Sequence, residues 1–315
     1  MTAPKPVTES KIKPASKSVT KPESKSSINA VYFIAEVSSN HNQDLARCLD
    51  FVDVAAAIGC DAIKFQLFRV ETLFAPKIVA NSEQHRGRKA WELPPAFIPD
   101  IADKCREKSI DFICSPFDIQ AVSVLQPYVK YYKISSYELM WDDLLIECAK
   151  TEKPLILSTG MATMAEVHHA VNIIQANTAV TPVLLHCTSS YPAPYAEANL
   201  AAIETLRLET GCRIGLSDHT VQPGVLQRAI HRWGAEYIEF HIDLEGQGAE
   251  YDKGHCWLPQ QIGPVIEQCN IGLTADGNGI KEPMPSELAD REWRADPKDG
   301  LRPLQKIRQA YTQSD

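Results

Sequence analysis

The chain has 315 residues, of which 44% are hydrophobic and 23% charged, with a formal net charge of −8. This is the composition of a globular protein whose core is large enough to fold without disulfides or a structural metal. The negative charge excludes an extended nucleic-acid-binding surface, and the lack of any apolar run of roughly 18 residues predicts neither a transmembrane helix nor a membrane partner.

The cysteine usage indicates a reducing compartment. The chain has nine cysteines, an odd number, with no C-x-x-C motif, and several, such as Cys60 and Cys114, lie in apolar runs. We interpret them as reduced, mostly buried thiols of a cytoplasmic enzyme. The N-terminus also lacks the apolar segment of a secretory signal.

Residues 1–28 differ from the rest of the chain in composition. They are rich in Lys, Ser, Pro and Thr and almost free of apolar side chains. Such a segment cannot bury enough surface to order itself, so a disordered tail is predicted.

From Val31 onward, short β-rich runs alternate with helical patterns. The predicted strands are Val31–Glu36, Ala62–Gln66, Asp111–Ser115, Tyr131–Ser135, Pro154–Ser158, Pro182–Cys187, Arg213–Ser217 and Tyr237–His241. Helical patterns include Asp44–Ile58, Met164–Gln175, Val221–Trp233 and Leu258–Leu273. Eight such repeats predict an α/β fold of the (β/α)8 TIM-barrel type over residues 29–277. An open doubly wound sheet is disfavoured, because no G-x-G-x-x-G follows the first strand.

Two segments do not fit the repeat. The connection Leu67–Trp91 follows the C-terminal end of the second strand and carries mixed charge, so it is a candidate lid or binding loop. A plain surface insertion is the alternative. Residues 278–315 hold several prolines among charged residues and are expected to form an extended tail that packs on the barrel.

Two histidines end neighbouring predicted strands. His219 follows the run Arg213–Ser217, and His241 closes the last run. The C-terminal strand ends of such a barrel form its active face, so both imidazoles are expected at one mouth. Imidazole is a common ligand of Zn, Mn and Fe, and the pair is predicted to hold one divalent ion. Two unrelated histidines at loop starts remain the alternative, because no His-Glu-x-x-His motif is present.

Lysines and hydroxyl groups gather at the same strand ends. They are Lys64, Ser115, Lys133, Ser135, Ser136, Ser158, Thr159 and Ser217. A barrel interior does not need two lysines for packing, so the set predicts a cradle for a phosphate or carboxylate group. A lysine that forms a Schiff base is the main competing mechanism. Metal ligands in the same mouth disfavour it.

Six polar segments along these strands form a recognisable series. They are Ile34-Ala-Glu-Val-Ser-Ser-Asn-His41, Ala62-Ile-Lys-Phe-Gln66, Tyr132-Lys-Ile-Ser-Ser-Tyr-Glu138, Leu157-Ser-Thr-Gly-Met161, Leu185-His-Cys-Thr-Ser-Ser-Tyr-Pro192 and Gly215-Leu-Ser-Asp-His219. In this order they resemble the sialic acid synthase (N-acetylneuraminate synthase) family. The resemblance covers about Val31 to Leu273, and the family's fold is a TIM barrel.

The resemblance implies an activity and a set of roles. The reaction would condense phosphoenolpyruvate with an N-acetylated, N-acetylmannosamine-like sugar, giving a sialic-acid-type nonulosonic acid and phosphate. The cofactor would be a divalent metal at His219 and His241, with Mn²⁺ first and Mg²⁺ or Co²⁺ as alternatives. Catalytic positions would be Glu36, Lys64, Lys133 and Glu138. Substrate contacts would be Gln66, Ser115, Ser136, Ser158, Ser189, Tyr191, Ser217 and Asp252. The expected partners are these small molecules and a second copy of the chain in a homodimer.

The chain also departs from the family pattern. Phe240 stands where a lysine is usual, Ser189 where an asparagine is frequent, and Ser135 and Tyr137 replace glycines. The family's C-terminal antifreeze-like domain, which lends an arginine to the partner's sugar site, has no counterpart in the tail. The acceptor sugar is therefore open: a legionaminic- or pseudaminic-type synthase is one alternative, and a non-catalytic barrel that binds a sugar phosphate is another.

Overall fold

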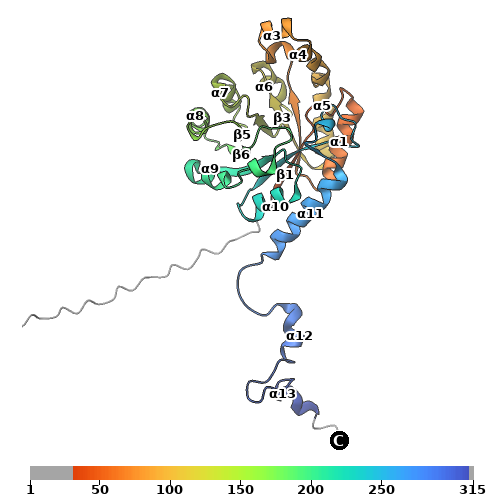
Figure 1. The fold of residues 1–315 in the computed structure, drawn as a ribbon, viewed down its shortest axis with the longest axis vertical. Helices are drawn as coiled ribbons and strands as arrows, with labels where there is room; N and C mark the ends of the chain where they lie inside the picture. Colours follow the sequence, from red (N-terminus) through yellow and green to blue (C-terminus); the bar gives the residue numbers. More distant parts are fainter. Residues whose placement is uncertain (1–30, 312–315) are drawn as a thin grey trace, which may run out of the picture.

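The fold is known from a computed structural model that describes residues 31–311. The tail predicted for residues 1–28 lies outside the described residues. In the described part, parallel strands form a closed ring surrounded by helices (Figure 1). This is a (β/α)8 TIM barrel, as predicted.

The strands run in sequence order around the barrel, and β1 closes the ring by pairing with β8. They are β1 (Tyr32–Glu36), β2 (Ala62–Leu67), β3 (Asp111–Pro116), β4 (Tyr131–Ile134), β5 (Leu155–Ser158), β6 (Val183–Cys187), β7 (Arg213–Asp218) and β8 (Tyr237–Ile242). Each predicted run matches a strand to within one residue at either end. A short strand that the sequence did not predict, β9 (Cys256–Trp257), pairs with the outer end of β8.

Helices cover the outside of the ring. The long ones are α1 (Leu45–Ala57), α5 (Ile98–Lys108), α6 (Ile119–Leu125), α7 (Asp142–Lys150), α8 (Met164–Gln175), α9 (Ala202–Thr210), α10 (Pro223–His231) and α11 (Pro259–Ala275). Their boundaries have local causes. Asp44 caps α1 by accepting from the backbone of Ala46 and Arg47, and Thr163 with Glu166 forms a capping box on α8.

The barrel interior is layered, because alternate residues of a strand face the same side. Its lower layer is apolar and consists of Ile34, Ala62, Ile113, Ile156, Val183, Leu185 and Tyr237. Two residues further along these strands stand Glu36, Lys64 and Glu239, all buried. Gly215 of β7 packs against this layer. Only glycine fits at this position, because a Cβ would come within 2.2 Å of the Tyr237 carbonyl oxygen. Because residues two apart on a strand face the same side, a charged layer lies directly above the apolar lower layer.

The connection after β2 is more ordered than a plain loop. It contains three short helices, α2 (Val70–Leu73), α3 (Pro76–Asn81) and α4 (Glu83–Gly87), followed by the 3₁₀ helix η1 (Arg88–Trp91). Helices α3 and α4 project from the barrel at the top of Figure 1.

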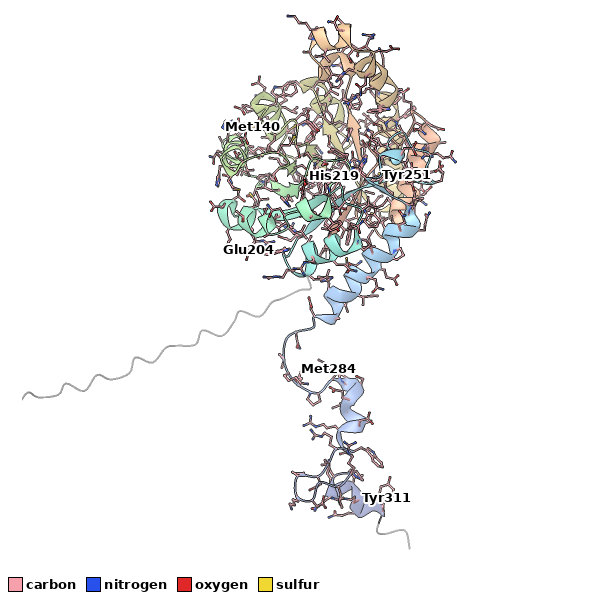
Figure 2. The ribbon with its side chains drawn as sticks, viewed as in Figure 1. Met140, Glu204, His219, Tyr251, Met284 and Tyr311 are labelled. Carbon is pink, nitrogen blue, oxygen red and sulfur yellow. The ribbon has the colours of Figure 1, made fainter. Side chains whose placement is uncertain are left out.

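The expectation that the C-terminal tail packs on the barrel is not met. Beyond α11 the chain runs away from the barrel, and Met284 and Tyr311 lie well below it in Figure 2. The short helices α12 (Leu288–Arg291) and α13 (Gln305–Arg308) are held together by bonds within the segment, such as Lys306 to Glu292 and Arg308 to Asp299. The ion pairs within the segment hold its short helices together without a barrel surface, although Leu288, Trp293 and Leu301 stay half or more exposed.

Two further expectations concern the thiols and the membrane. All nine cysteines are buried and free of disulfides, as the sequence analysis predicted. Among residues 31–311, no helix combines the length and the apolar character that crossing a bilayer requires.

Candidate active site

Four buried charges form the base of the barrel mouth, and we call Glu36, Lys64, Lys133 and Glu239 the floor. The Lys64 ammonium contacts the Glu36 carboxylate directly and lies 3.7 Å from Glu239 Oε1. Lys133 Nζ lies 3.5 Å from the same oxygen of Glu239. The strand register explains the first pair, since Glu36 and Lys64 are partners across β1 and β2. Each side chain of the floor is at most 4% exposed, so every charge depends on its neighbours.

Burial and the neighbouring charges shift the pKa values of the floor residues in different directions. Burial raises the pKa of Glu36 and lowers that of Lys133. For Lys64, burial opposes ionisation, but Glu239 and Glu36 outweigh it and raise the pKa. For Glu239, burial is outweighed by Lys133 and Lys64, and the pKa falls to about 2. Glu239 is therefore the carboxylate of the floor that stays ionised, whereas burial favours the protonated form of Glu36.

Hydroxyl groups surround the floor. Lys133 donates to Ser158 Oγ at 2.7 Å, and Ser217 donates to Glu239 Oε1 at 3.2 Å. Ser115 is buried, and within residues 31–311 its Oγ has no hydrogen-bond partner. The predicted lysines and these three serines thus meet at one end of the barrel. Two lysines beside unengaged and weakly engaged hydroxyls can take up an anionic group.

A second group of small polar side chains meets around Gly160. Its backbone N–H donates to Ser136 Oγ at 3.0 Å. A Cβ on Gly160 would lie 2.2 Å from Ser189 Oγ and 3.3 Å from Cys187 Sγ, so only glycine fits here. The close packing around Gly160 places Ser136 and Ser189 near one another. Both residues were predicted to contact the substrates.

A cavity of about 470 Å³ opens above the floor. Among the predicted residues, Gln66, Glu138, Tyr191 and His241 line it. Gln66 donates to Glu36 Oε1 at 2.6 Å and so connects the cavity wall to the floor. Glu138 accepts from Ser135, and burial raises its pKa. A larger hollow of about 910 Å³ beside the start of α11 is mostly apolar and lies away from these groups.

The two predicted metal ligands lie side by side in the mouth. The rings of His219 and His241 have centres 5.2 Å apart, and Tyr191 packs on His219 at 4.2 Å. His219 stands in the middle of the barrel in Figure 2. His219 Nδ1 lies 2.9 Å from the carbonyl oxygen of Thr188, which can only accept, so Nε2 is left with the free lone pair. Burial lowers the pKa of His241 to about 3, which keeps its imidazole neutral and able to ligate.

The loop after β8 brings three further groups to His241 that the sequence analysis did not assign. Glu250 Oε2 lies 3.7 Å from His241 Nδ1 and 3.8 Å from His255 Nε2. Burial opposes ionisation of Glu250, but the facing imidazoles prevail and hold its pKa well below the usual value. Cys256 is the partner of His241 in the register of β8 and β9. The sequence did offer one indication of these residues, because residues of the types that bind metals are concentrated in Glu250–Cys256. The conformation of this loop, however, could not be predicted from the sequence.

Asp252 does not lie where the sequence analysis expected. It is exposed and does not line the cavity, whereas Glu250 and Lys253 do. The reason is the 3₁₀ turn η4 (Tyr251–Lys253), in which residues three apart share a face. Glu250 and Lys253 lie on one face, with 3.7 Å between Oε1 and Nζ, and Asp252 points away.

The insertion after β2 supplies the outer wall of the cavity, and we call Phe74, Arg88 and Trp91 the rim. All three line the cavity and are half-buried. The Arg88 guanidinium lies 5.4 Å from the ring centres of both Phe74 and Trp91. These cation–π contacts hold a positive charge between two aromatic rings at the cavity edge.

Comparisons with known proteins agree with this geometry. The NeuB family model matches residues 51–281. An uncharacterized protein of Methanocaldococcus jannaschii is 35% identical over 258 residues, 81% of this chain and 75% of that protein. The N,N'-diacetyllegionaminic acid synthase of Campylobacter jejuni is 33% identical over 267 residues, 81% of this chain and 80% of that protein. The crystal structure of the N-acetylneuraminic acid (sialic acid) synthetase of Leptospira borgpetersenii in complex with citrate matches with a TM-score of 0.75 at 31% identity, covering 85% of this chain and 92% of that chain.

Proposed function

The chain belongs to the NeuB family of nonulosonic acid synthases, and we propose that it condenses phosphoenolpyruvate with an N-acetylated amino sugar and releases phosphate. The sugar we propose is N-acetylmannosamine-like, and the product a sialic-acid-type acid. The observation that carries the proposal is the floor: two lysines and two glutamates, all buried, beneath a cavity of 470 Å³. A barrel that only binds a neutral sugar has no need of such a set.

The anionic substrate is assigned to the floor. Lys64 and Lys133 would neutralise the carboxylate and phosphate of phosphoenolpyruvate, whose negative charge shifts as the reaction proceeds. Ser115, Ser158 and Ser217 would donate to the remaining oxygens. Glu239 would keep both lysines charged, because their burial alone disfavours ionisation.

The reaction steps can be assigned to residues of this chain. The nucleophile is C3 of phosphoenolpyruvate, which forms a carbon–carbon bond to the aldehyde carbon of the sugar and leaves positive charge at C2. Water then adds to C2 and loses one proton to Glu36, whose raised pKa suits it for that role. That proton neutralises the alkoxide formed on the former aldehyde oxygen. The bond from C2 to the phosphate oxygen breaks, the second proton of the water leaves with the phosphate, and C2 becomes a ketone as inorganic phosphate departs from beside the two lysines. Gln66 would hold Glu36 in position.

The residues at the mouth fit a divalent ion. His219 and His241 would hold it, and the fit is supported by the lone pair left on His219 Nε2 and by the burial that keeps the His241 imidazole neutral. Such an ion supplies Lewis-acid polarisation of a carbonyl group. Tyr191, packed on His219, would help exclude water from that side of the sugar.

A second candidate acceptor is favoured by the aromatic part of the cavity. Phe68, Phe74, Trp91 and Phe117 all line it, which gives an apolar wall beside the polar floor. A 2,4-diacetamido-6-deoxy sugar, of the legionaminic type, carries more methyl groups than N-acetylmannosamine and would bury them there. On this alternative the chemistry at the floor is unchanged and only the acceptor differs.

The test is phosphate release from phosphoenolpyruvate, measured with Mn²⁺, Mg²⁺ or Co²⁺ against a panel of 2-acetamido and 2,4-diacetamido hexoses. We expect phosphate to appear only when a sugar is present, in equal amount to a new sugar acid detected by mass spectrometry. The sugar with the highest kcat/KM identifies the acceptor. If phosphoenolpyruvate binds but no sugar and no metal gives phosphate, the barrel is a binding protein and the proposal fails.

A further inference from the structure

His255 is a buried histidine at the end of the loop that follows β8. The residue is 1% exposed, and neither Nδ1 nor Nε2 is hydrogen-bonded within residues 31–311. Leaving such polar atoms unpaired away from water costs free energy, so each case in a native fold calls for a physical reason. A bound cation that the imidazole ligates is such a reason.

Two other ligand-type side chains lie beside it. One ligand atom from each of His241, His255 and Cys256 lies within 4.8 Å of the other two, and all three residues are buried. The cluster is fixed by backbone pairing, because His241 and Cys256 are register partners on β8 and β9. It is therefore assembled by the sheet and does not depend on a loop conformation alone.

The surroundings orient the ring nitrogens. The Glu250 carboxylate oxygen that faces His241 Nδ1 and His255 Nε2 can only accept protons when ionised. Hydrogen atoms on these two nitrogens leave His241 Nε2 and His255 Nδ1 with their lone pairs. A carboxylate behind an imidazole in this way is the usual support of a metal-bound histidine.

The sulfur is also supported. Asn40 Nδ2 donates to Cys256 Sγ at 3.5 Å and to the carbonyl oxygen of Ile242 at 2.9 Å. An N–H group aimed at the sulfur suits a thiolate better than a thiol. Asn40 itself is fully buried, so the donor is fixed in place.

We propose that His255 and Cys256 join His241 as ligands of a divalent ion, so that the metal site of this chain extends beyond the pair His219 and His241. This rests on the proposed function only through the shared residue His241. A set of two imidazoles and a thiolate favours Zn²⁺ or Co²⁺ over Mn²⁺, because sulfur is a soft ligand. Glu250 and Asn40 are positioning residues that act through the ligands.

The first test uses the unaltered full-length protein after dialysis against a chelator. Isothermal titration with Zn²⁺, Co²⁺ and Mn²⁺ gives affinities, and the absorption spectrum of the Co²⁺ form reports a sulfur ligand through a thiolate-to-cobalt charge-transfer band. We expect Zn²⁺ and Co²⁺ to bind at least about tenfold more tightly than Mn²⁺, with the band present. Tightest binding of Mn²⁺ and no band would overturn the proposal without any variant having to fold.

Variants then assign the ligands. His255→Ala and Cys256→Ser should each weaken Zn²⁺ binding by more than the roughly 10–100-fold that loss of an outer-shell partner costs, and Glu250→Gln should fall within that range. Cys256→Ser should also abolish the charge-transfer band. His168→Ala, half-buried on α8, and Cys148→Ser, buried on α7, are the matched controls and should bind as the parent does. Parent-like affinity in both His255→Ala and Cys256→Ser would contradict the ligand set.

The outcomes separate this inference from the proposed activity. Tight Zn²⁺ binding lost in His255→Ala, together with no phosphate release from any sugar, would keep the site and reject the synthase reaction. If the protein releases phosphate, and its metal affinity is unchanged in His255→Ala but lost in His219→Ala, the synthase reaction is kept and the extended metal site is rejected.

Discussion

The floor and the rim of the cavity are built on different principles. The floor residues Glu36, Lys64, Lys133 and Glu239 stand on four strands, are buried, and hold one another by ion pairs. The rim residues Phe74, Arg88 and Trp91 come from a single insertion, are half-buried, and hold one another by cation–π contacts. The floor is thus fixed by the whole barrel, whereas the rim stands on one insertion built of short helices.

The difference suggests a division of work. Buried charges without access to water interact strongly, so a change in the floor should affect the bond-making steps. Partly solvated contacts are weaker, so a change in the rim should affect how well a given sugar is held. Substitutions in the two regions should therefore separate kcat effects from effects on the sugar KM.

The largest effect is expected from Lys133→Ala. The charge that Lys133 meets grows in the transition state, so kcat for phosphate release should fall by roughly 100–1,000-fold and the KM for phosphoenolpyruvate should rise. Steady-state phosphate release measures both. Lys130→Ala, an exposed lysine just before β4, is the control. Unchanged phosphoenolpyruvate kinetics in Lys133→Ala would remove Lys133 from the anion cradle.

The next effect concerns stability at low pH. Burial is outweighed by Lys133 and Lys64, which lower the pKa of Glu239 from its ordinary value of 4.5 to about 2, so its carboxylate stabilises the fold above pH 4.5 and this contribution is lost as the pH falls through 2. The shift corresponds to about 3 kcal/mol. Urea unfolding between pH 6 and 2 should show a shallower loss of stability in Glu239→Gln than in the parent.

The control for this measurement is Glu204→Gln, which alters an exposed carboxylate on α9. Protonation of His241, whose pKa falls from 6.5 to about 3, destabilises the fold in the same direction as the pH drops. It does so in both proteins, so the difference between them isolates Glu239. Parallel pH profiles for Glu239→Gln and the parent would show that Glu239 is not the ionised counter-charge.

The rim should give a smaller and different effect. Arg88→Ala removes the charge held between Phe74 and Trp91, and the KM for the sugar should rise by about three- to tenfold, the equivalent of about 1 kcal/mol. The KM for phosphoenolpyruvate should not change. Arg86→Ala is the matched control, because Arg86 belongs to the same insertion but its guanidinium donates to the carbonyl oxygens of Val79 and Ala80. If Arg88→Ala raised the KM values of the sugar and of phosphoenolpyruvate equally, the proposed separation of roles between floor and rim would be contradicted.

The smallest effect is expected from removal of the tail. A chain that ends at Gly277 lacks the segment that was expected to pack on the barrel, including Trp293 and the tail arginines. The segment runs away from the barrel, so the condensation rate and the sugar KM should match those of the full chain (Figure 2). A raised sugar KM would show that the tail reaches a site, in the same chain or in a second copy.

The two lysines of the floor and the hydroxyl groups around it could be placed at one end of the barrel from the sequence, because strands have a simple period. Lys64 and Gln66 lie two residues apart on β2 and therefore face the same interior, as do Glu239 and His241 on β8. Glu239 was recognisable by that rule as part of the floor, although the sequence analysis assigned it no role. Loops follow no such period. The sequence analysis therefore chose Asp252 as a substrate contact, although Glu250 is the residue that lines the cavity.

The sequence by itself determined the barrel, the strand ends and the residues that face its interior, since all three follow from the alternation of short apolar runs with helical patterns. Only the tertiary structure decided which groups meet from distant parts of the chain. The pairing of β9 with β8 sets Cys256 beside His241, the turn η4 directs Glu250 toward both imidazoles, and the insertion after β2 carries Arg88 to the cavity edge. These contacts join residues through loops whose conformation depends on packing, and no local pattern in the sequence encodes it.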